Sequence, residues 1–387
     1  MRRRAVVVIV ALVMAGACAS DSEGDDQTAV GPSNTTPPTT TEPAPPPTTT
    51  TTSVREVPGV DWPRIDATDA GLAPSAIDDV RAVAAAAESD CLVVVHDGQL
   101  VHEEYWDETT ADTDQEIFST TKSVSAVLVG IAQDQGHLDI DEPASTYLTE
   151  WHGTPSEAVT IGQLLTNTSG RYWDFTTDYV EMVGADDRSA FSIALDQQHE
   201  PGTVWVYNNA AIQTLEEVLE RATGQDVAEF AAEHLFDPIG MDVEFGRDPA
   251  GNPATFFSLR AGCLDMARFG LLALEGGRWG TDQVVSADYM AAATSPSTDL
   301  NAAYGYLWWL NARDGWVHPD PRRDTSAAFW PDAPLDAYAA LGLGNQVVAV
   351  LPSHDLVVVR LGRRDAAGAE GPAGVLINDL AAALTRP

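Results

Sequence analysis

Lysine is almost absent from this 387-residue chain. Its 21 basic residues are twenty arginines and one lysine, Lys122, and they are outnumbered by 58 acidic residues, so the formal net charge is -37. A surface this acidic repels phosphate backbones and offers them no basic patch. The composition therefore argues against nucleic acid as a partner, and we expect the excess of carboxylates to serve solubility or salt tolerance.

Cysteine is scarce as well, with three in the whole chain: Cys18, Cys91 and Cys263. None belongs to a CxxC pair, and the eight histidines show no HExxH spacing. The sequence therefore predicts no metal site, and we expect no cofactor. A bridge between Cys91 and Cys263 would join residues far apart in the chain, so we expect two buried free thiols, with a disulfide as the alternative in an oxidising compartment.

The apolar run at the N-terminus, residues 5–14, is too short to span a bilayer. It follows three arginines at positions 2–4, which is typical of an export signal. Residues 15–18, Ala-Gly-Ala-Cys, resemble a bacterial lipobox, in which the cysteine becomes a lipidated N-terminus. We expect a secreted or cell-envelope protein anchored through Cys18. The alternative is a plain signal-peptidase site with an incidental cysteine.

Apolar residues are nearly missing from positions 19–56, where Ser, Thr, Pro, Asp and Gly dominate. Such a composition cannot bury a core, so this stretch is predicted to be a disordered linker. In an extended form, at about 3.1 Å per residue, it would reach on the order of 100 Å. The folded part is expected over 57–387, without a second linker or a repeat.

The segment 57–387 predicts a mixed α and β domain. Strand-like stretches occur near both ends, whereas helical periodicity dominates from about 119 to 280. This order predicts an α/β (α+β) fold, in which one antiparallel sheet from N- and C-terminal segments is flanked by helices and an all-helical region is inserted. The expected elements are a helix over 75–89, strand hairpins over 91–96 with 99–106 and over 346–351 with 356–361, and a helix over 373–384.

The single lysine follows a serine by three positions at the start of a predicted helix. Ser119 and Lys122 would share one face of its first turn, so the amine can reach the hydroxyl. A serine nucleophile needs a base, and lysine can serve only if its pKa falls by about 2 to 3 units. Arginine cannot lose its proton, so keeping one lysine at this position favours a catalytic pair. The alternative is a surface Ser and Lys, because S-x-x-K also occurs by chance.

A second polar cluster, Tyr207-Asn208-Asn209, follows a Pro-Gly turn and opens another helical run. The Tyr207 hydroxyl could carry a proton to a leaving group, and the Asn209 amide could hold a substrate carbonyl or the lysine. Taken alone, such a cluster is more often a helix cap or a turn.

Together, Ser119-x-x-Lys122 and Tyr207-x-Asn209 resemble the first two motifs of the β-lactamase-related serine hydrolases of class C type. That group includes penicillin-binding proteins, esterases and linear-amide hydrolases of the 6-aminohexanoate-dimer type. The resemblance implies a β-lactamase/transpeptidase-like fold and an acyl-enzyme mechanism in which Ser119 attacks while Lys122 and Tyr207 move protons. It continues in family order through the segments 164–170, 265–270, 276–279 and 304–309.

The third motif of that family is altered here. Penicillin-recognising members carry Lys-Thr-Gly, or His in place of Lys, on the strand beside the nucleophile, and the matching stretch is 342–346, Gly-Leu-Gly-Asn-Gln. Leu343 cannot bind a carboxylate. A backbone N–H near Gln346 could still form an oxyanion hole with that of Ser119.

We therefore predict an exported serine hydrolase of a small ester or linear amide, with Asn209, Gly344, Asn345 and Gln346 as substrate-binding residues. One alternative is a β-lactamase or D-alanyl-D-alanine carboxypeptidase, which would also accept a small-molecule or peptide substrate. The other is a catalytically silent envelope binding protein of the same fold.

Overall fold

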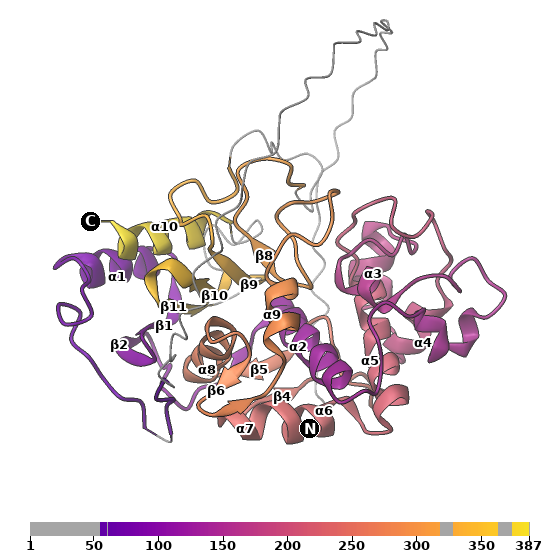
Figure 1. Ribbon diagram of the computed structural model, residues 1–387, viewed down its shortest axis with the longest axis horizontal. Helices are drawn as coiled ribbons and strands as arrows, with labels where there is room; N and C mark the ends of the chain where they lie inside the picture. Colours follow the sequence, from indigo (N-terminus) through magenta and orange to yellow (C-terminus); the bar gives the residue numbers. More distant parts are fainter. Residues whose placement is uncertain (1–54, 60, 318–327, 363–373, 387) are drawn as a thin grey trace, which may run out of the picture. The chain divides into compact units, whose positions relative to one another are not determined.

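The computed structural model describes residues 55–59, 61–317, 328–362 and 374–386 (Figure 1). The predicted signal peptide over 1–18, with Cys18, and all but the last two residues of the predicted linker over 19–56 lie outside these ranges. The chain divides after Thr52, and every described residue belongs to the unit that follows. Within the described ranges, no helix combines the length and the apolar character needed to cross a membrane.

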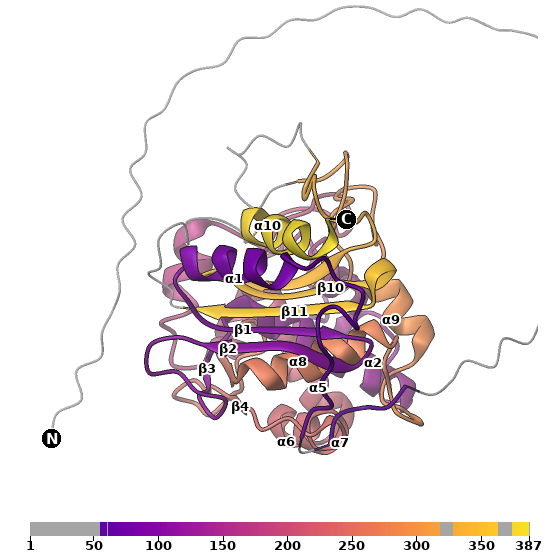
Figure 2. The ribbon, with the colours of Figure 1, turned by 90° about the vertical axis from the view of Figure 1, so that its left-hand side faces the viewer.

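The main sheet has six strands in the order β2-β1-β11-β10-β9-β8, and its strand pairings are antiparallel. Its centre joins the two ends of the folded unit, because β1 pairs with β11 from Leu92 opposite Arg360 to His96 opposite Leu356 (Figure 2). The predicted sheet of N- and C-terminal segments is thereby confirmed. The strands are β1 (Ser89–His96), β2 (Gln99–Tyr105), β8 (Trp309–Leu310), β9 (Tyr338–Gly342), β10 (Gln346–Leu351) and β11 (Leu356–Gly362).

Helices cover both faces of this sheet (Figure 2). On one face lie α1 (Ala76–Ala86) and α10 (Gly374–Thr385), and on the other lies α8 (Cys263–Leu274). Because both faces are withdrawn from water, the central strands β1 and β11 are largely continuous runs of valine and leucine rather than alternating patterns. The two predicted hairpins and the two predicted terminal helices are confirmed, with ends that differ by at most three residues.

A disulfide joins Cys91 in β1 to Cys263 at the start of α8. The expectation of two free thiols is therefore wrong. The cysteines are 172 positions apart in the chain, but α8 packs across β1, and this brings their Cα atoms to 6.4 Å, a separation that a disulfide can bridge. Tertiary packing of helix on sheet decides the pairing, and the distance along the chain does not reveal it.

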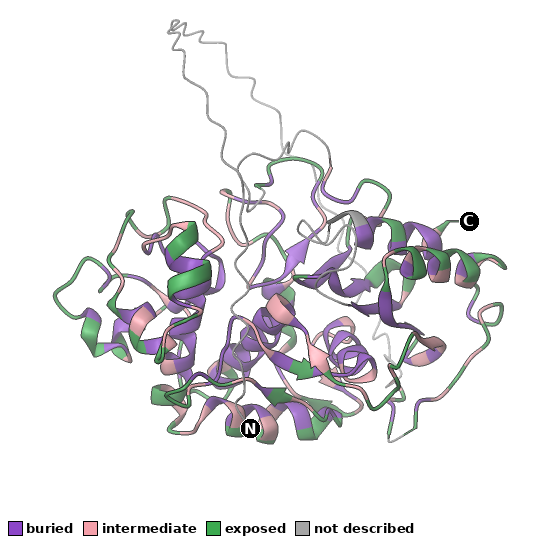
Figure 3. Cartoon of the chain, turned by 180° about the vertical axis from the view of Figure 1, so that it is seen from behind, coloured by how far each residue is buried: buried purple, intermediate pink, exposed green. Residues whose placement is uncertain are grey.

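The helices between the terminal segments form the inserted region that the sequence predicts. A group of α3 (Ile161–Leu165), α4 (Arg188–Ala194) and α5 (Asn209–Thr223) lies apart from the sheet, and α2 (Thr121–Asp134) runs between that group and the strands (Figure 1). Every residue of α2 from Thr121 to Ala132 is buried, and burial follows the inward sides of the elements (Figure 3). The remaining elements are α6 (Val227–Ala231), α7 (Asp237–Ile239), α9 (Ala287–Ala293), β3 (Gln115–Glu116), β4 (Glu244–Phe245), β5 (Leu259–Ala261), β6 (Arg278–Trp279) and β7 (Asp282–Gln283).

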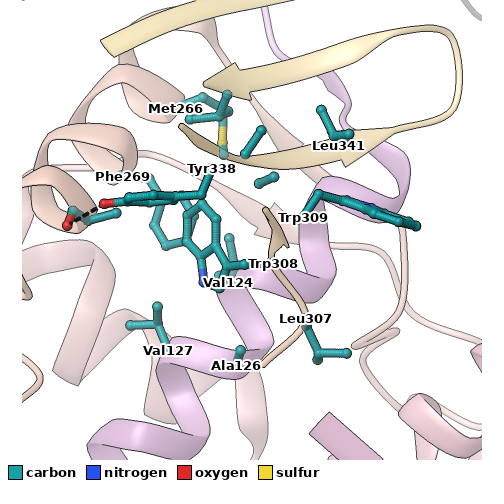
Figure 4. Packing of buried hydrophobic residues seen from close by; sticks show 14 of the residues in the cluster. Val124, Ala126, Val127, Met266, Phe269, Leu307, Trp308, Trp309, Tyr338 and Leu341 are labelled. Carbon is teal, nitrogen blue, oxygen red and sulfur yellow. Dashed lines mark hydrogen bonds between the residues drawn. The ribbon is translucent and has the colours of Figure 1, made fainter. Parts of the chain in front are cut away.

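A cluster of aromatic rings fixes α2 against the sheet. Trp308 stacks on Phe269 of α8 with ring centroids 5.5 Å apart and meets the ring of Tyr338 edge-on, also at 5.5 Å. Val124 and Val127 of α2 lie beside the same indole (Figure 4). Aromatic side chains bury large apolar areas, so this cluster stabilises the position of the helix that carries Lys122.

Candidate active site

Ser119 lies in a short 3-10 turn, Phe118–Thr120, which leads directly into α2. Phe118 has a φ of 47°, in the left-handed region that a bulky side chain rarely occupies. Thr121 holds this turn, because its hydroxyl donates to the Phe118 carbonyl oxygen at 2.6 Å and accepts from the Leu259 N–H at 3.1 Å. Ser119 is thereby presented at the N-terminus of a buried helix, where the helix dipole favours negative charge.

Lys122 is one helical turn further on, and its side chain is 1% exposed. Its Nζ lies 2.9 Å from Ser119 Oγ and donates to the Phe256 carbonyl oxygen at 2.7 Å. Burial lowers the pKa of Lys122 to about 7, although the charge of Asp178 acts in the opposite direction. Near neutral pH a large share of the amine is therefore uncharged and carries a lone pair that can accept the Ser119 proton.

Tyr207 completes a three-residue cluster with Ser119 and Lys122. Its ring lies 4.8 Å from Lys122 Nζ, and its hydroxyl is within hydrogen-bonding reach of Ser119. Burial keeps the pKa of Tyr207 well above its usual value, so the hydroxyl is neutral. The ring stacks on Trp309 at a centroid distance of 5.9 Å. The structure thus brings Ser119, Lys122 and Tyr207 together, as the sequence predicts.

Tyr207 is held in place by the start of α5. The side chain of Asn208 caps this helix by accepting from the Ala211 N–H at 2.8 Å, and its amide group donates to the Tyr172 carbonyl oxygen at 3.1 Å. The Asn208 N–H in turn donates to Asn167 Oδ1 at 3.2 Å. The helix-cap interpretation of this cluster is confirmed for Asn208, and the catalytic role of Tyr207 stays a prediction.

Asp178 is a residue of the site that sequence reasoning missed. Its carboxylate is 1% exposed and accepts from Asn209 Nδ2 at 2.8 Å, from the Ala210 N–H at 2.8 Å and from Trp173 Nε1 at 3.2 Å. Burial raises the pKa of Asp178 to about 6, while hydrogen bonds from Ala210 and Asn209 and the charge of Lys122 oppose that rise. Nothing in the local sequence separates Asp178 from Asp174 four positions earlier, so no signal pointed to it.

The stretch that matches the third motif lies differently from the prediction. β9 ends at Gly342. The backbone of Gly342 lies against the Ile117 carbonyl oxygen, and a Cβ added to Gly342 would stand 2.9 Å from Thr120 Oγ1. Gln346 lies in the next strand, β10, where it pairs with Gly342 of β9. The Gln346 N–H is therefore one strand further from Ser119 than expected. The strand end nearest the nucleophile is therefore Gly342, followed by Leu343.

The other predicted substrate-binding residues make structural hydrogen bonds. The Gln346 side chain is fully buried and donates to the Leu343 carbonyl oxygen at 3.2 Å. The carbonyl oxygens of Gly344 and Asn345 accept from Arg360 at 2.7 and 2.8 Å. Binding of substrate by these three residues and by Asn209 stays a prediction. No cluster of three or more His, Cys, Asp or Glu suited to a metal ion occurs among the residues that the structure describes.

A family model described as Beta-lactamase matches residues 77–382. The chain belongs to the Beta-lactamase family. This confirms the resemblance inferred from Ser119-x-x-Lys122 and Tyr207-x-Asn209, since the match spans both motifs and nearly all of the folded unit. The protein is accordingly a β-lactamase-fold member of the serine hydrolases.

Similar proteins of this Beta-lactamase family include hydrolases of amides and esters. The 6-aminohexanoate-dimer hydrolase of Paenarthrobacter ureafaciens is 22% identical over 291 residues, which cover 63% of this chain and 73% of that protein. A solved structure assigned to a 6-aminohexanoate-dimer hydrolase of Bacillus anthracis covers 84% of this chain and 88% of its own, with a TM-score of 0.66 and 19% identity. A family VIII carboxylesterase covers 80% of this chain and 97% of its own, with a TM-score of 0.57 and 17% identity. At these identities the solved structures establish the fold, and the chemistry has to be argued from the site.

Proposed function

We propose that this protein hydrolyses a small ester or linear amide through an acyl-enzyme on Ser119. The observation that supports the proposal most strongly is the buried amine of Lys122, 2.9 Å from Ser119 Oγ and with a pKa of about 7. A lysine in this state is a base, and a neighbouring serine hydroxyl is the group that it can deprotonate. The family's carboxylesterase and amide-hydrolase members carry out reactions of this class.

The reaction has two halves. In the first, Ser119 Oγ attacks the substrate carbonyl carbon and its proton passes to Lys122 Nζ. The oxyanion is stabilised by the Ser119 N–H and by a second backbone N–H from the end of β9, where Gly342 lies against the turn of Ser119. Tyr207 relays the proton from Lys122 to the leaving alcohol or amine as the bond to the carbonyl carbon breaks. In the second half, water gives a proton to the same base, attacks the acyl carbon and releases the acid, and Ser119 regains its proton.

Esters and linear amides are preferred over penicillins because of Leu343. This side chain is 43% exposed at the end of the strand beside the nucleophile and is apolar, whereas penicillin-recognising relatives present a cation in this motif. A carboxylate on the substrate would find no charge partner at Leu343. Preferred turnover of a β-lactam or a D-Ala-D-Ala peptide would favour the alternative function.

We also propose that the protein works outside the cytoplasm, exported by residues 1–18 and anchored by a lipid on Cys18. The support is the sequence pattern alone, because these residues lie outside the described ranges. Mass spectrometry of the N-terminal peptide from a membrane fraction would reveal a diacylglyceryl-modified Cys18 if the proposal holds. An unmodified peptide from the culture medium would contradict the anchor.

The test of the nucleophile is labelling with a fluorophosphonate probe, followed by intact mass and peptide mapping. We expect one adduct, on Ser119, that is lost in Ser119→Ala and retained in the matched control Ser123→Ala. Ser123 is a buried serine of the adjoining helix α2, and its hydroxyl donates to the Leu307 carbonyl oxygen. The same protein would be assayed with p-nitrophenyl esters, a linear amide, nitrocefin and a D-Ala-D-Ala peptide. Labelling of Ser123 or of neither serine would overturn the proposal.

A second test asks whether Lys122 acts as a base or only as a charge. Lys122→Arg keeps the charge but cannot release a proton, so turnover of the best ester should fall by about 100-fold or more. Activity close to that of the unmodified protein would contradict proton transfer through Lys122.

A further inference from the structure

We propose that Asp178 is a positioning residue of this site, which fixes the amide of Asn209 and supplies the counter-charge for the ammonium that Lys122 becomes during acyl transfer. The proposal rests on the proposed function, because only a reaction that protonates Lys122 needs such a counter-charge. It assigns a role to a buried carboxylate that the acyl-transfer steps leave without one.

The hydrogen bonds of Asp178 determine which way the Asn209 amide points. Asn209 Nδ2 donates to Asp178 Oδ2, and the N–H of Ala210, the next residue of α5, donates to Asp178 Oδ1. Trp173 Nε1 supplies a third donor to the carboxylate. A carboxylate can accept from all three donors, whereas an asparagine in its place would turn its own NH2 group against at least one of them. The start of α5, two residues after Tyr207, is therefore held by the charged form of Asp178.

The second role follows from the charges around Lys122. Asp178 is hydrogen-bonded to Asn209 and Ala210, which closely follow Tyr207 in the chain, and the Tyr207 ring lies 4.8 Å from Lys122 Nζ. The negative charge of Asp178 acts on the buried Lys122 amine. Two phenols also belong to this part of the site: Tyr207, next to Lys122, and Tyr179, which interacts with Asn209 and Tyr207. Burial raises the pKa of Tyr207, so this phenol is neutral at ordinary pH and supplies no negative charge.

When Lys122 takes the proton of Ser119, a cation forms in a site from which water is almost excluded. An isolated buried ammonium is costly, and a carboxylate nearby lowers that cost. Asp178 is already ionised and held in place by three donors, so its charge is available without rearrangement. The carboxylate thus stabilises the protonated state of Lys122 that acyl transfer produces.

The unusual composition of the chain gives a direct test. Because Lys122 is the single lysine, protein grown with 13Cε-labelled lysine gives one lysine resonance, and its shift with pH reports the protonation of Lys122 without any assay of activity. In Asp178→Asn the midpoint should move to lower pH by about one unit or more, since an opposite charge favours the protonated amine by that amount. The acid limb of kcat/KM for a p-nitrophenyl ester should shift with it, and kcat should fall more than KM changes.

Asp248→Asn is the matched control. Asp248 is 6% exposed and accepts from the N–H groups of Arg188, Gly251 and Asn252 at 2.8 to 2.9 Å. Loss of the Asp248 carboxylate should lower the stability of the protein. It should not change the midpoint pH of the Lys122 titration or the pH profile of kcat/KM. An equal shift in both variants would overturn the proposal, because a general loosening of the fold would explain it. An unchanged midpoint in Asp178→Asn would overturn it too.

If Asp178→Asn does not fold, the unmodified protein provides the readout. Its lysine resonance should show a second, smaller inflection near pH 6, where Asp178 takes up a proton. A single inflection would contradict the coupling. Failure of the fluorophosphonate and ester experiments would instead overturn the proposed function, so the two results are distinguishable.

Discussion

The side-chain nitrogen of Lys122 donates to the backbone carbonyl oxygen of Phe256 at 2.7 Å, across 134 positions of sequence. A neutral amine has two N–H groups and one lone pair. Since one N–H is held by this carbonyl group, rotation of the amine is restricted, and its lone pair can face Ser119 Oγ, 2.9 Å away. The segment before β5, which is distant from Lys122 in the chain, thus orients this amine.

The pH dependence of activity should follow the amine. The protonated form of Lys122 cannot accept the Ser119 proton, so kcat/KM for a simple ester should rise with pH and level off above the Lys122 pKa of about 7. A pH profile of the unmodified protein over pH 5 to 9 would check this. A profile that is flat through pH 7, or that falls across it, would contradict a neutral lysine as the base.

Replacing Lys122 by an apolar residue should change how stability depends on pH. Folding lowers the Lys122 pKa from 10.5 to about 7, so between these values the unfolded chain binds a proton that the folded chain does not. The lysine therefore penalises folding most at and below pH 7, and the penalty disappears as pH rises towards 10.5.

The variant Lys122→Met tests this sign. The gain in melting temperature of Lys122→Met over the unmodified protein should shrink as the pH increases from 6 to 9. Arg221→Met, which removes an exposed ion-paired cation, is the control and should show no such trend. A difference for Lys122→Met that grows with pH would mean that the amine is charged in the folded protein.

The disulfide between Cys91 and Cys263 should make a large contribution to stability. It closes a loop across 172 positions, and removing such a cross-link increases the entropy of the unfolded chain. The double variant Cys91→Ala/Cys263→Ala should lose about 2 to 5 kcal/mol of unfolding free energy in urea. Neither cysteine touches Ser119 or Lys122 by any described contact, so the folded double variant should keep its ester turnover. An unfolding free energy unchanged by the double substitution would show that the two residues are not bridged in solution.

Gly342 should tolerate no side chain. A Cβ at this position would collide with the Ile117 carbonyl oxygen and stand 2.9 Å from Thr120 Oγ1, so Gly342→Ala has to push β9 away from the turn that carries Ser119. We expect a loss of about 10-fold or more in kcat/KM, because small displacements at a reacting centre are costly. Gly59→Ala is the control, since a Cβ there meets no atom within 4 Å. Equal activity of the two variants would show that the spacing between β9 and the turn does not limit the reaction.

Much of the fold was predictable because its signals are local. Apolar periodicity marked α2, and the Asp97-Gly98 pair, with φ of 49° and 73°, marked the first hairpin. The contrast between strand-rich ends and a helical middle predicted one antiparallel sheet built from the N- and C-terminal segments. The family match supports the same reading over residues 77–382.

Site residues were predictable only where an unusual composition or a motif spacing distinguishes them in the sequence. The single lysine three residues after Ser119 is one such feature, and the Tyr207-x-Asn209 motif is another. Asp178 has no such feature, because the sequence does not distinguish one buried acidic residue from many exposed ones. The Phe256 carbonyl group has none either, since every residue carries a backbone carbonyl group.

By itself, then, the sequence determined which groups could exchange a proton and where the two hairpins and the terminal helices lie, because residue type and periodicity are properties of short stretches of chain. Only the tertiary structure decided that Cys91 meets Cys263, that Gly342 rather than Gln346 lies against the turn of Ser119, and that Asp178 binds the start of α5. Each of these depends on how elements distant in the chain pack, and burial, which sets the pKa of the amine, exists only after they have packed.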